Sequence, residues 1–240
     1  MKKISIVFLV FNEEGSIKKL VERSISELKN MPYEYEMLIV NNASTDNTGQ
    51  IIDKLAGAYP SIKIIHHPSN LGYAMSTLTA FKKSKGDLIF IIDGDGQLTV
   101  ADIPAFVDKL ESGYEILFGW RVKRIEPFMR IVFTKFLSLF AKLILHYPFH
   151  DINCGFRAVP RQIADRIEIN HKLNAVGPEI YVWGKLNNCK IGEVPVQHFP
   201  READSSIFVP WTIPGAILKI IRYLLQLRKE LRSGDKKNSK

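Results

Sequence analysis

Short runs of apolar, largely β-branched residues alternate with amphipathic segments through the first half of this 240-residue chain. An apolar run without polar alternation is typical of a parallel strand buried on both faces, and apolar residues three or four apart are typical of a covering helix. The expected strands span residues 4–11, 36–40, 61–66, 88–92 and 115–118. The expected helices span residues 15–29, 48–58, 72–83 and 103–112. This rhythm predicts an α/β fold with a mostly parallel central sheet flanked by helices.

Polar side chains follow three of the expected strands. They lie at residues 12–14 after the first strand, 41–42 after the second and 93–97 after the fourth. Ligands of open parallel sheets bind at the carboxyl ends of the strands, where such loops meet. The sequence therefore predicts a binding site at this edge of the sheet.

The segment Asp93-Gly94-Asp95-Gly96-Gln97 has the clearest chemical signature. Two carboxylates and an amide oxygen occupy alternate positions, and glycines between them allow a tight turn. Oxygen ligands of this kind suit Mg²⁺ or Mn²⁺ that keeps some of its waters and bridges a substrate diphosphate. The same residues would also suit a glycine-rich turn with solvated acids. The chain contains no Walker A sequence and no Rossmann glycine fingerprint.

The net charge of +8 is concentrated in two segments. Residues 118–150 hold six basic residues and one acid, and residues 215–240 hold eight basic residues and two acids. The rest of the chain is therefore slightly acidic. Basic segments of this kind suit nucleic acid, an anionic membrane surface or a phosphorylated substrate. Nucleic acid is not expected, because the body is acidic and the chain has no nucleic-acid recognition motif.

Both basic segments are also apolar. Residues 128–147 predict a helix with one polar stripe, and residues 217–231 predict a basic amphipathic helix followed by a disordered polar tail over 233–240. Charges interrupt the first segment, so no uncharged run there is long enough to cross a membrane. Either helix could lie on a membrane surface, cover the core, or pair with an integral-membrane partner or a second copy.

The start of the chain and its cysteines bear on its compartment. The apolar run after Met1 is interrupted by Asn12 and two glutamates, so no signal peptide is expected. The two cysteines, Cys154 and Cys189, form no disulfide framework and fit a reducing compartment.

Four motifs in order resemble those of glycosyltransferase family 2. They are Val10-Phe11-Asn12-Glu13-Glu14, residues 41–48 (Asn-Asn-Ala-Ser-Thr-Asp-Asn-Thr), Asn70-Leu71-Gly72, and residues 93–97. Residues 119–121, 151–157 and 193–196, together with Arg201 and Ser205-Ser206, resemble the dolichol-phosphate mannose synthase branch, which makes polyprenyl-phosphate sugars. The resemblance implies a GT-A domain over residues 1–206, and leaves residues 207–240 as a basic amphipathic helix and polar tail.

The resemblance also implies a reaction and its residues. It implies inverting transfer of a hexose from a nucleotide-diphosphate sugar to a dolichyl or undecaprenyl phosphate, at the cytoplasmic face of a membrane. The implied nucleotide-sugar residues are Phe11, Asn12, Glu13, Asn42, Ser44, Asp46, Gly72, Asp93 and Arg121. The implied ligands of Mg²⁺ or Mn²⁺ are Asp93, Asp95 and Gln97. The implied acceptor-phosphate residues are Arg121, Arg130, Arg157, Arg201 and Ser205.

The acceptor decides which residues are catalytic. A phosphate acceptor is already anionic at neutral pH, and Asp95 and Arg201 would then stabilise the charges of the reaction. A sugar hydroxyl needs a general base, for which Asp151 and Glu179 are the candidates, unless each forms an ion pair with an arginine. A family 2 transferase acting on a hydroxyl and a non-catalytic nucleotide-sugar-binding module are the alternatives.

Overall fold

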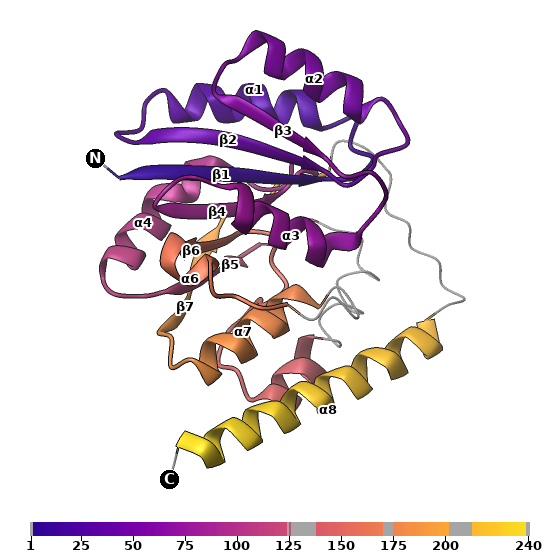
Figure 1. Ribbon diagram of the computed structural model, residues 1–240, viewed down its shortest axis with the longest axis vertical. Coiled ribbons are helices and arrows are strands. Elements are labelled where there is room, and N and C mark those ends of the chain that lie inside the picture. The colour runs from indigo at the N-terminus through magenta and orange to yellow at the C-terminus, as the bar shows by residue number, and fades with distance from the viewer. Residues whose placement is uncertain (1, 124, 126–137, 170–174, 202–212, 239–240) are drawn as a thin grey trace.

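The computed structural model describes residues 2–123, 125, 138–169, 175–201 and 213–238 (Figure 1). Its centre is a seven-stranded sheet with the strand order β3-β2-β1-β4-β6-β5-β7. The strands are β1 (Lys3–Val10), β2 (Glu34–Asn41), β3 (Ile62–His66), β4 (Leu88–Asp93), β5 (Ile116–Arg121), β6 (Arg157–Pro160) and β7 (Ile191–Val196). Among the strands of the described ranges, only β6 runs antiparallel, to both of its neighbours β4 and β5. The prediction of a mostly parallel sheet is confirmed.

Helices cover both faces of the sheet, as predicted. They are α1 (Ile17–Leu28), α2 (Thr48–Ala58), α3 (Gly72–Lys83), α4 (Ile103–Glu111), α6 (Arg161–Ala164), α7 (Val176–Leu186) and α8 (Ile213–Asn238). Alternate residues of β1 enter different cores. Ile6 and Phe8 pack in the core that includes residues of α1 and α4, whereas Val7 and Leu9 pack in the core that includes residues of α3 and α7. This two-sided burial explains why the strand sequences are continuously apolar.

Two strands, β6 and β7, and two helices, α6 and α7, of the second half were not predicted. Strand β6 has four residues and carries Arg157, so it has too little apolar pattern to be recognised. Strand β7 contains Gly192 and Pro195, which weaken a strand prediction, although proline is tolerated at the edge of a sheet, where β7 lies. Helix α6 has only four residues, and helix α7 falls in a segment without clear boundary signals.

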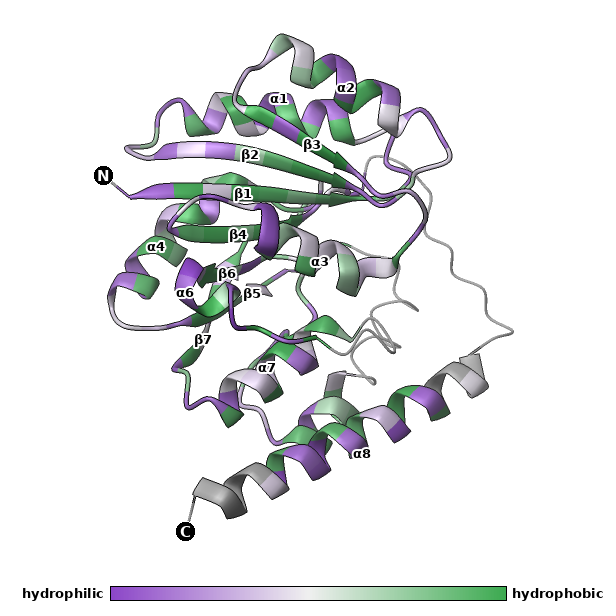
Figure 2. Cartoon of the chain, viewed as in Figure 1, coloured by the Kyte–Doolittle hydropathy of each residue, from purple (hydrophilic) through white to green (hydrophobic). Residues whose placement is uncertain are grey.

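Helix α8 packs against α7 at one side of the molecule (Figures 1 and 2). Tyr223, Leu224 and Leu227 are its buried residues. The helix extends to Asn238, so the prediction of a disordered tail from residue 233 is wrong up to that residue. Once a helix is anchored, each added residue gains a hydrogen bond without a new nucleation cost. No helix in the described ranges is both long and apolar enough to cross a membrane.

The expected helix over residues 128–147 is described only from residue 138. Residues 138–145 are helical, and residues 126–137 lie outside the described part. Ala141 and Leu145 are buried in the core, whereas Leu139 and Leu143 are more than half exposed. One face of this helix therefore belongs to the core, and the opposite face carries exposed leucines.

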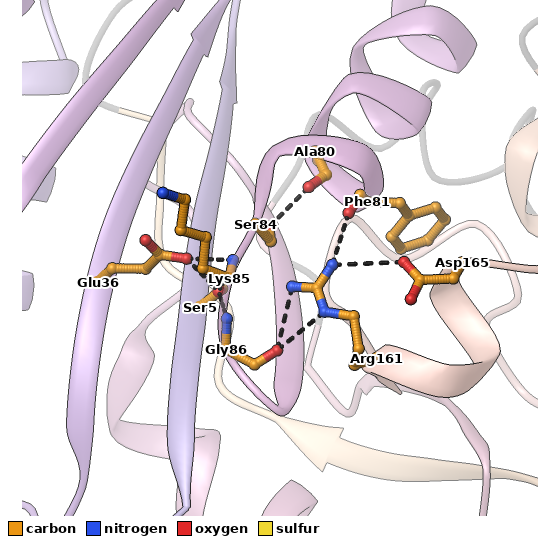
Figure 3. Close-up of polar contacts among 9 residues, drawn as sticks. All are labelled: Ser5, Glu36, Ala80, Phe81, Ser84, Lys85, Gly86, Arg161 and Asp165. Atoms are coloured by element: carbon orange, nitrogen blue, oxygen red, sulfur yellow. Dashed lines mark hydrogen bonds and ion pairs between the residues drawn. The ribbon is translucent and has the colours of Figure 1, made fainter.

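A buried carboxylate organises the amino ends of the central strands (Figure 3). Glu36 Oε1 accepts a hydrogen bond from Ser5 Oγ at 2.7 Å and another from the backbone N–H of Lys85, and its Oε2 accepts one from Lys63 Nζ at 2.9 Å. Burial alone would raise the pKa of Glu36, but these hydrogen bonds outweigh it and hold the pKa below its usual value. The backbone N–H of Gly86 donates to Ser5 Oγ at 2.7 Å. The turn between α3 and β4 is thereby fixed, and with it the start of β4.

Replacing this carboxylate tests its contribution to stability. We expect Glu36→Gln to lower the free energy of unfolding at neutral pH by about 1–3 kcal/mol. The NH₂ group of the new amide would face either the backbone N–H of Lys85 or the ammonium of Lys63, so that one of these donors would lose its acceptor. Urea unfolding monitored by circular dichroism measures the change. Glu34→Gln, an exposed residue of the same strand, is the control. An equal, small effect of both substitutions would contradict the assigned role.

Candidate functional site

Hydrogen bonds join the loops that follow β1 and β2 into one wall. Asn12 has a positive φ of 56°, and its backbone N–H donates to Ser44 Oγ at 2.9 Å. Its side-chain oxygen accepts a hydrogen bond from the backbone N–H of Thr45 at 2.8 Å. The backbone N–H of Glu13 donates to Thr48 Oγ1 at 2.8 Å. Asn12 and Ser44, both expected to bind the nucleotide, therefore hold this wall together.

Asp46 has a similar structural role. Its two oxygens accept hydrogen bonds from the backbone N–H groups of Thr48, at 3.0 Å, and Glu14, at 3.2 Å. Burial alone would raise the pKa of Asp46, but hydrogen bonds from Thr48 and Glu14 keep it below its usual value. The carboxylate thus stabilises the start of α2 and the adjoining loop, so the structure gives Asp46 a role other than contacting a ligand.

A cavity of about 350 Å³ opens at the carboxyl ends of β1, β2 and β4, where the sequence predicts a site. Six of the expected site residues line it: Phe11, Glu13, Asn42, Gly72, Asp93 and Asp95. Three residues that were not predicted as site residues, Asn70, Tyr73 and Ser76, also line it. The i, i+3 spacing of Tyr73 and Ser76 is a sequence signal that would have placed these two on one face of α3, and Asn70 lies in the loop just before that helix.

The side chain of Asn42 has one fixed orientation. Its Oδ1 accepts a hydrogen bond from the backbone N–H of Leu71 at 2.9 Å and lies 3.0 Å from His67 Nδ1. Its Nδ2 donates to Asn70 Oδ1 at 2.8 Å. Because a backbone N–H can only donate, the oxygen of the Asn42 amide must face Leu71. The amide is therefore preorganised where the family resemblance expects contact with the base.

The turn after β4 brings two carboxylates together. The backbone N–H of Gly94 donates to the carbonyl of Leu9 at 2.9 Å, and a Cβ at Gly94 would lie 2.3 Å from Val10 Cγ1, so only glycine fits. Burial, followed by the charge of Asp93, raises the pKa of Asp95 to about 6. Two partly buried carboxylates in mutual repulsion are a suitable place for a divalent cation.

Gln97, in the same turn, contacts a distant segment of the chain. Within the described ranges, no group of three or more Asp, Glu, His or Cys side chains is arranged to hold a metal ion. Gln97, the third expected ligand, donates from Nε2 to the carbonyl of Phe199 at 3.2 Å. The backbone N–H of Phe199 also donates to the carbonyl of Gln97 at 2.8 Å. Gln97 thus holds the segment that leads to Arg201.

Arg201, expected to contact the acceptor phosphate, lies beside the carboxylates. Its Nη2 donates to Glu13 Oε1 at 2.5 Å, although the two residues are 188 positions apart in the sequence. Burial raises the pKa of Glu13 even though Arg201 acts in the opposite direction. The charge of Arg201 also lowers the pKa of Asp95 against the effect of burial. The guanidinium of Arg201 therefore partly compensates the negative charge of Glu13 and Asp95.

Asp151 forms an ion pair. Arg121 Nε donates to Asp151 Oδ2 at 2.7 Å, and Arg121 Nη2 donates to Oδ1 at 3.1 Å, a two-bond geometry that fixes both groups. Of the two interpretations of Asp151, the structure therefore supports an ion pair rather than a general base.

This ion pair borders a second cavity of about 560 Å³ at the end of β5. The cavity is lined by cationic, aromatic and aliphatic side chains together with Ser138 and Asp151: Trp120, Arg121, Val122, Lys123, Ser138, Leu139, Lys142, Tyr147, Phe149, His150 and Asp151. Trp120 and His150 stack with ring centroids 4.0 Å apart. The lining can hold an anionic group next to an apolar one.

Two other expected site residues lie elsewhere. Arg157 is buried at the start of β6 and donates from Nη1 to the hydroxyl of Tyr73 at 2.8 Å, rather than facing an acceptor cavity. Glu179 is buried in α7 and lines a separate cavity of about 290 Å³ with Glu230 of α8. The structure therefore does not bring Glu179 together with Asp93 and Asp95. Arg130 and Ser205 lie outside the described residues.

The burial of Asp95, together with its repulsion by Asp93, has a measurable consequence. Asp95 ionises near its ordinary 3.8 in the unfolded chain and near pH 6 in the folded one, so stability falls as pH rises through this interval. Asp95→Asn removes the buried charge and with it the repulsion, and its side-chain oxygen still accepts the N–H of Gln97. We expect a higher melting temperature at pH 7, by a few degrees, and a gain that vanishes toward pH 4. Thermal unfolding in EDTA measures both.

The control is Asp108→Asn, which changes an exposed carboxylate of α4. If both substitutions raise the melting temperature equally, or if the gain of Asp95→Asn is independent of pH, the repulsion is not the cause.

The chain is similar to known proteins over most of its length. Undecaprenyl-phosphate 4-deoxy-4-formamido-L-arabinose transferase of Proteus mirabilis is 27% identical over 229 residues, which are 95% of this chain and 67% of that protein. Dodecaprenyl-phosphate galacturonate synthase of Rhizobium johnstonii is 27% identical over 235 residues, which are 97% of this chain and 69% of that protein.

A solved structure supports the fold. Glucosyl-3-phosphoglycerate synthase of Mycobacterium tuberculosis, in complex with Mn²⁺, UDP-glucose and phosphoglyceric acid, has a TM-score of 0.66 and 18% identity; the match covers 95% of this chain and 79% of that one. Residues 5–167 of this chain match the family described as Glycosyl transferase family 2. The fold, the order of the motifs and this match agree: the chain belongs to glycosyl transferase family 2 and is a glycosyltransferase with the GT-A fold.

Proposed function

We propose that this protein transfers a hexose, with inversion, from a nucleotide-diphosphate sugar to a polyprenyl phosphate such as dolichyl or undecaprenyl phosphate. The observation that carries the proposal is the second cavity, where Arg121, Lys123 and Lys142 lie among aromatic and aliphatic side chains. A lipid phosphate combines the two chemistries that such a lining binds, an anionic head and an apolar chain. The two similar proteins are named for undecaprenyl and dodecaprenyl phosphate.

A short segment connects the two cavities. Asp151 lines the second cavity, and four residues later the Cα of Gly155 lies against Asp93, so that a Cβ there would be 1.9 Å from Asp93 Oδ2. Because consecutive Cα atoms are 3.8 Å apart, the Cα atoms of Asp151 and Gly155 are separated by no more than about 15 Å. An acceptor phosphate near Arg121 would therefore lie within reach of a sugar held at the carboxylates.

The proposed donor site is the first cavity. Asp93 and Asp95 would hold Mg²⁺ or Mn²⁺ together with the donor diphosphate, and the cation would neutralise the charge on the departing nucleoside diphosphate. Arg201, held by Glu13, would contact phosphate oxygens. Phe11 and Asn42 line the cavity at positions suited to the nucleoside.

A phosphate acceptor needs no general base, because it is ionised at neutral pH. This agrees with the two-bond pairing of Asp151 to Arg121, which leaves Asp151 to orient the guanidinium instead of taking a proton. Arg121 would then face the acceptor phosphate in a fixed geometry. The nearby lysines would add positive charge.

Acceptor choice tests the proposal directly. With UDP- and GDP-sugars and Mg²⁺ or Mn²⁺, we expect transfer to polyprenyl phosphate and none to the matching polyprenol. Lys142→Ala removes a cation from the second cavity and should raise KM for the lipid phosphate about tenfold while changing kcat little. Lys54→Ala, an exposed lysine of α2, should leave KM unchanged. Transfer to a sugar hydroxyl in place of the phosphate would overturn the acceptor assignment.

We also propose that the protein binds peripherally to the cytoplasmic face of a membrane. Leu218, Arg222, Leu225, Lys229 and Arg232 form an exposed stripe along α8 with the spacing of one helix face. Arg228 on α8 contacts His146 at 2.9 Å, which places α8 next to the segment that follows helix 138–145. Exposed leucines beside cations are suited to an interface of acyl chains and anionic headgroups.

Vesicle flotation tests this surface. We expect wild-type protein to float with vesicles that contain anionic lipid, and Arg222→Glu/Lys229→Glu to bind at least tenfold more weakly, because each cation near such a surface contributes about 1 kcal/mol. Lys18→Glu/Lys54→Glu makes the same charge change on α1 and α2, and should float like the wild type. Equal flotation of both double variants would show that α8 is not the docking surface.

A further inference from the structure

Two hydrogen bonds connect Asp93 to a buried arginine through Tyr73. Arg157 Nη1 donates to the hydroxyl of Tyr73 at 2.8 Å, and this hydroxyl donates to Asp93 Oδ1 at 2.7 Å. The guanidinium carbon also lies 5.6 Å from the centroid of the Tyr73 ring. A cation and a carboxylate are therefore joined by one phenol, at the wall of the first cavity.

The direction of both hydrogen bonds is fixed by chemistry. An arginine side chain has donors only, and an ionised carboxylate has acceptors only. The Tyr73 hydroxyl must therefore accept from Arg157 and give its single proton to Asp93. The connection has one arrangement and cannot reverse.

The sheet topology brings the three residues together. Arg157 pairs with Ile91 across the antiparallel ladder of β6 and β4, two positions before Asp93. Since alternate residues of a strand share a face, Arg157, Ile91 and Asp93 lie on the same face of the sheet. Ile91 packs in the core that α3 helps to form, and Tyr73 comes from the first turn of α3.

The other side of the Asp93 carboxylate is closed by backbone. A Cβ at Gly155 would lie 1.9 Å from Asp93 Oδ2 and 2.2 Å from its Cγ, so the Cα of Gly155 is in close contact with this group. Asp95, in contrast, accepts the backbone N–H of Gln97 at 3.1 Å, within its own turn. Asp93 is thus held from two sides by distant parts of the chain.

We propose that Tyr73 and Arg157 are positioning residues that hold the Asp93 carboxylate in one orientation beside Asp95. This inference rests on the proposed function, in which these carboxylates receive a divalent cation and the donor diphosphate. Without the phenol, repulsion from Asp95 would favour rotation of Asp93 away from it. The hydrogen bond from the Tyr73 hydroxyl, which Arg157 holds in place, opposes that rotation. Both carboxylates therefore stay oriented for cation binding.

Cation binding measures this role without turnover. Titration of Mn²⁺ into protein with UDP or GDP, followed by the electron paramagnetic resonance signal of unbound Mn²⁺, gives the Mn²⁺ affinity. Tyr73→Phe keeps the ring and removes the hydroxyl, and should weaken Mn²⁺ binding at least tenfold. Arg157→Met should have a similar effect, and Arg157→Lys, which keeps a donor, should restore part of the affinity. Tyr223→Phe removes a buried hydroxyl near Glu179 and should leave Mn²⁺ affinity unchanged.

The double variant distinguishes a relay from two separate effects. Because Arg157 acts through Tyr73, Tyr73→Phe/Arg157→Met should bind Mn²⁺ no more weakly than the weaker single variant. Fully additive losses, or wild-type affinity of Tyr73→Phe, would overturn the inference while leaving the proposed function intact. Absence of Mn²⁺ binding by the wild type with both nucleotides would overturn the inference together with the metal part of the proposed function.

Discussion

Repulsion between the carboxylates of Asp93 and Asp95 is the constraint to which the surrounding structure responds. Asp93 ends β4 and Asp95 follows two residues later, and β4 lies between β1 and β6 in the middle of the sheet, so the strand end fixes where both carboxylates lie. Positive charge reaches the pair from two directions, through Tyr73 from Arg157 and directly from Arg201. A partly compensated acidic pair of this kind retains affinity for a cation, whereas full neutralisation by an arginine would remove it.

The loops around this pair owe their rigidity to side chains that do not face the cavity. Backbone N–H groups of these loops donate hydrogen bonds to the side chains of Asn12, Ser44 and Asp46. At the amino ends of the strands, Glu36 and Ser5 fix the start of β4. The strand that delivers the carboxylates is therefore held at both ends, which limits the movement of the cavity wall.

Much of the first half was predictable because its signals are local. Residues 93–97 are recognisable because acids and glycines follow directly on a buried apolar strand. Six of the expected site residues line one cavity. Strand β6 was not predicted because its four residues show too little apolar periodicity. The contact between Arg157 and Tyr73, which depends on this strand, could therefore not be predicted either. Glu179 was expected near the reaction because of its acidity, but helix α7 places it against α8, a packing choice that depends on the whole second half.

The sequence by itself determined the order of strands and helices in the first half, the ends of the strands at which polar residues gather, and the family. Periodicity and short motifs specify these features, and they act over a few neighbouring residues. Only the tertiary structure decided which arginines serve which carboxylates. Asp151 engages Arg121, Glu13 engages Arg201, and Asp93 reaches Arg157 through Tyr73. Such pairings depend on strand register and crossovers between residues 30 to 188 positions apart, and no local pattern encodes them.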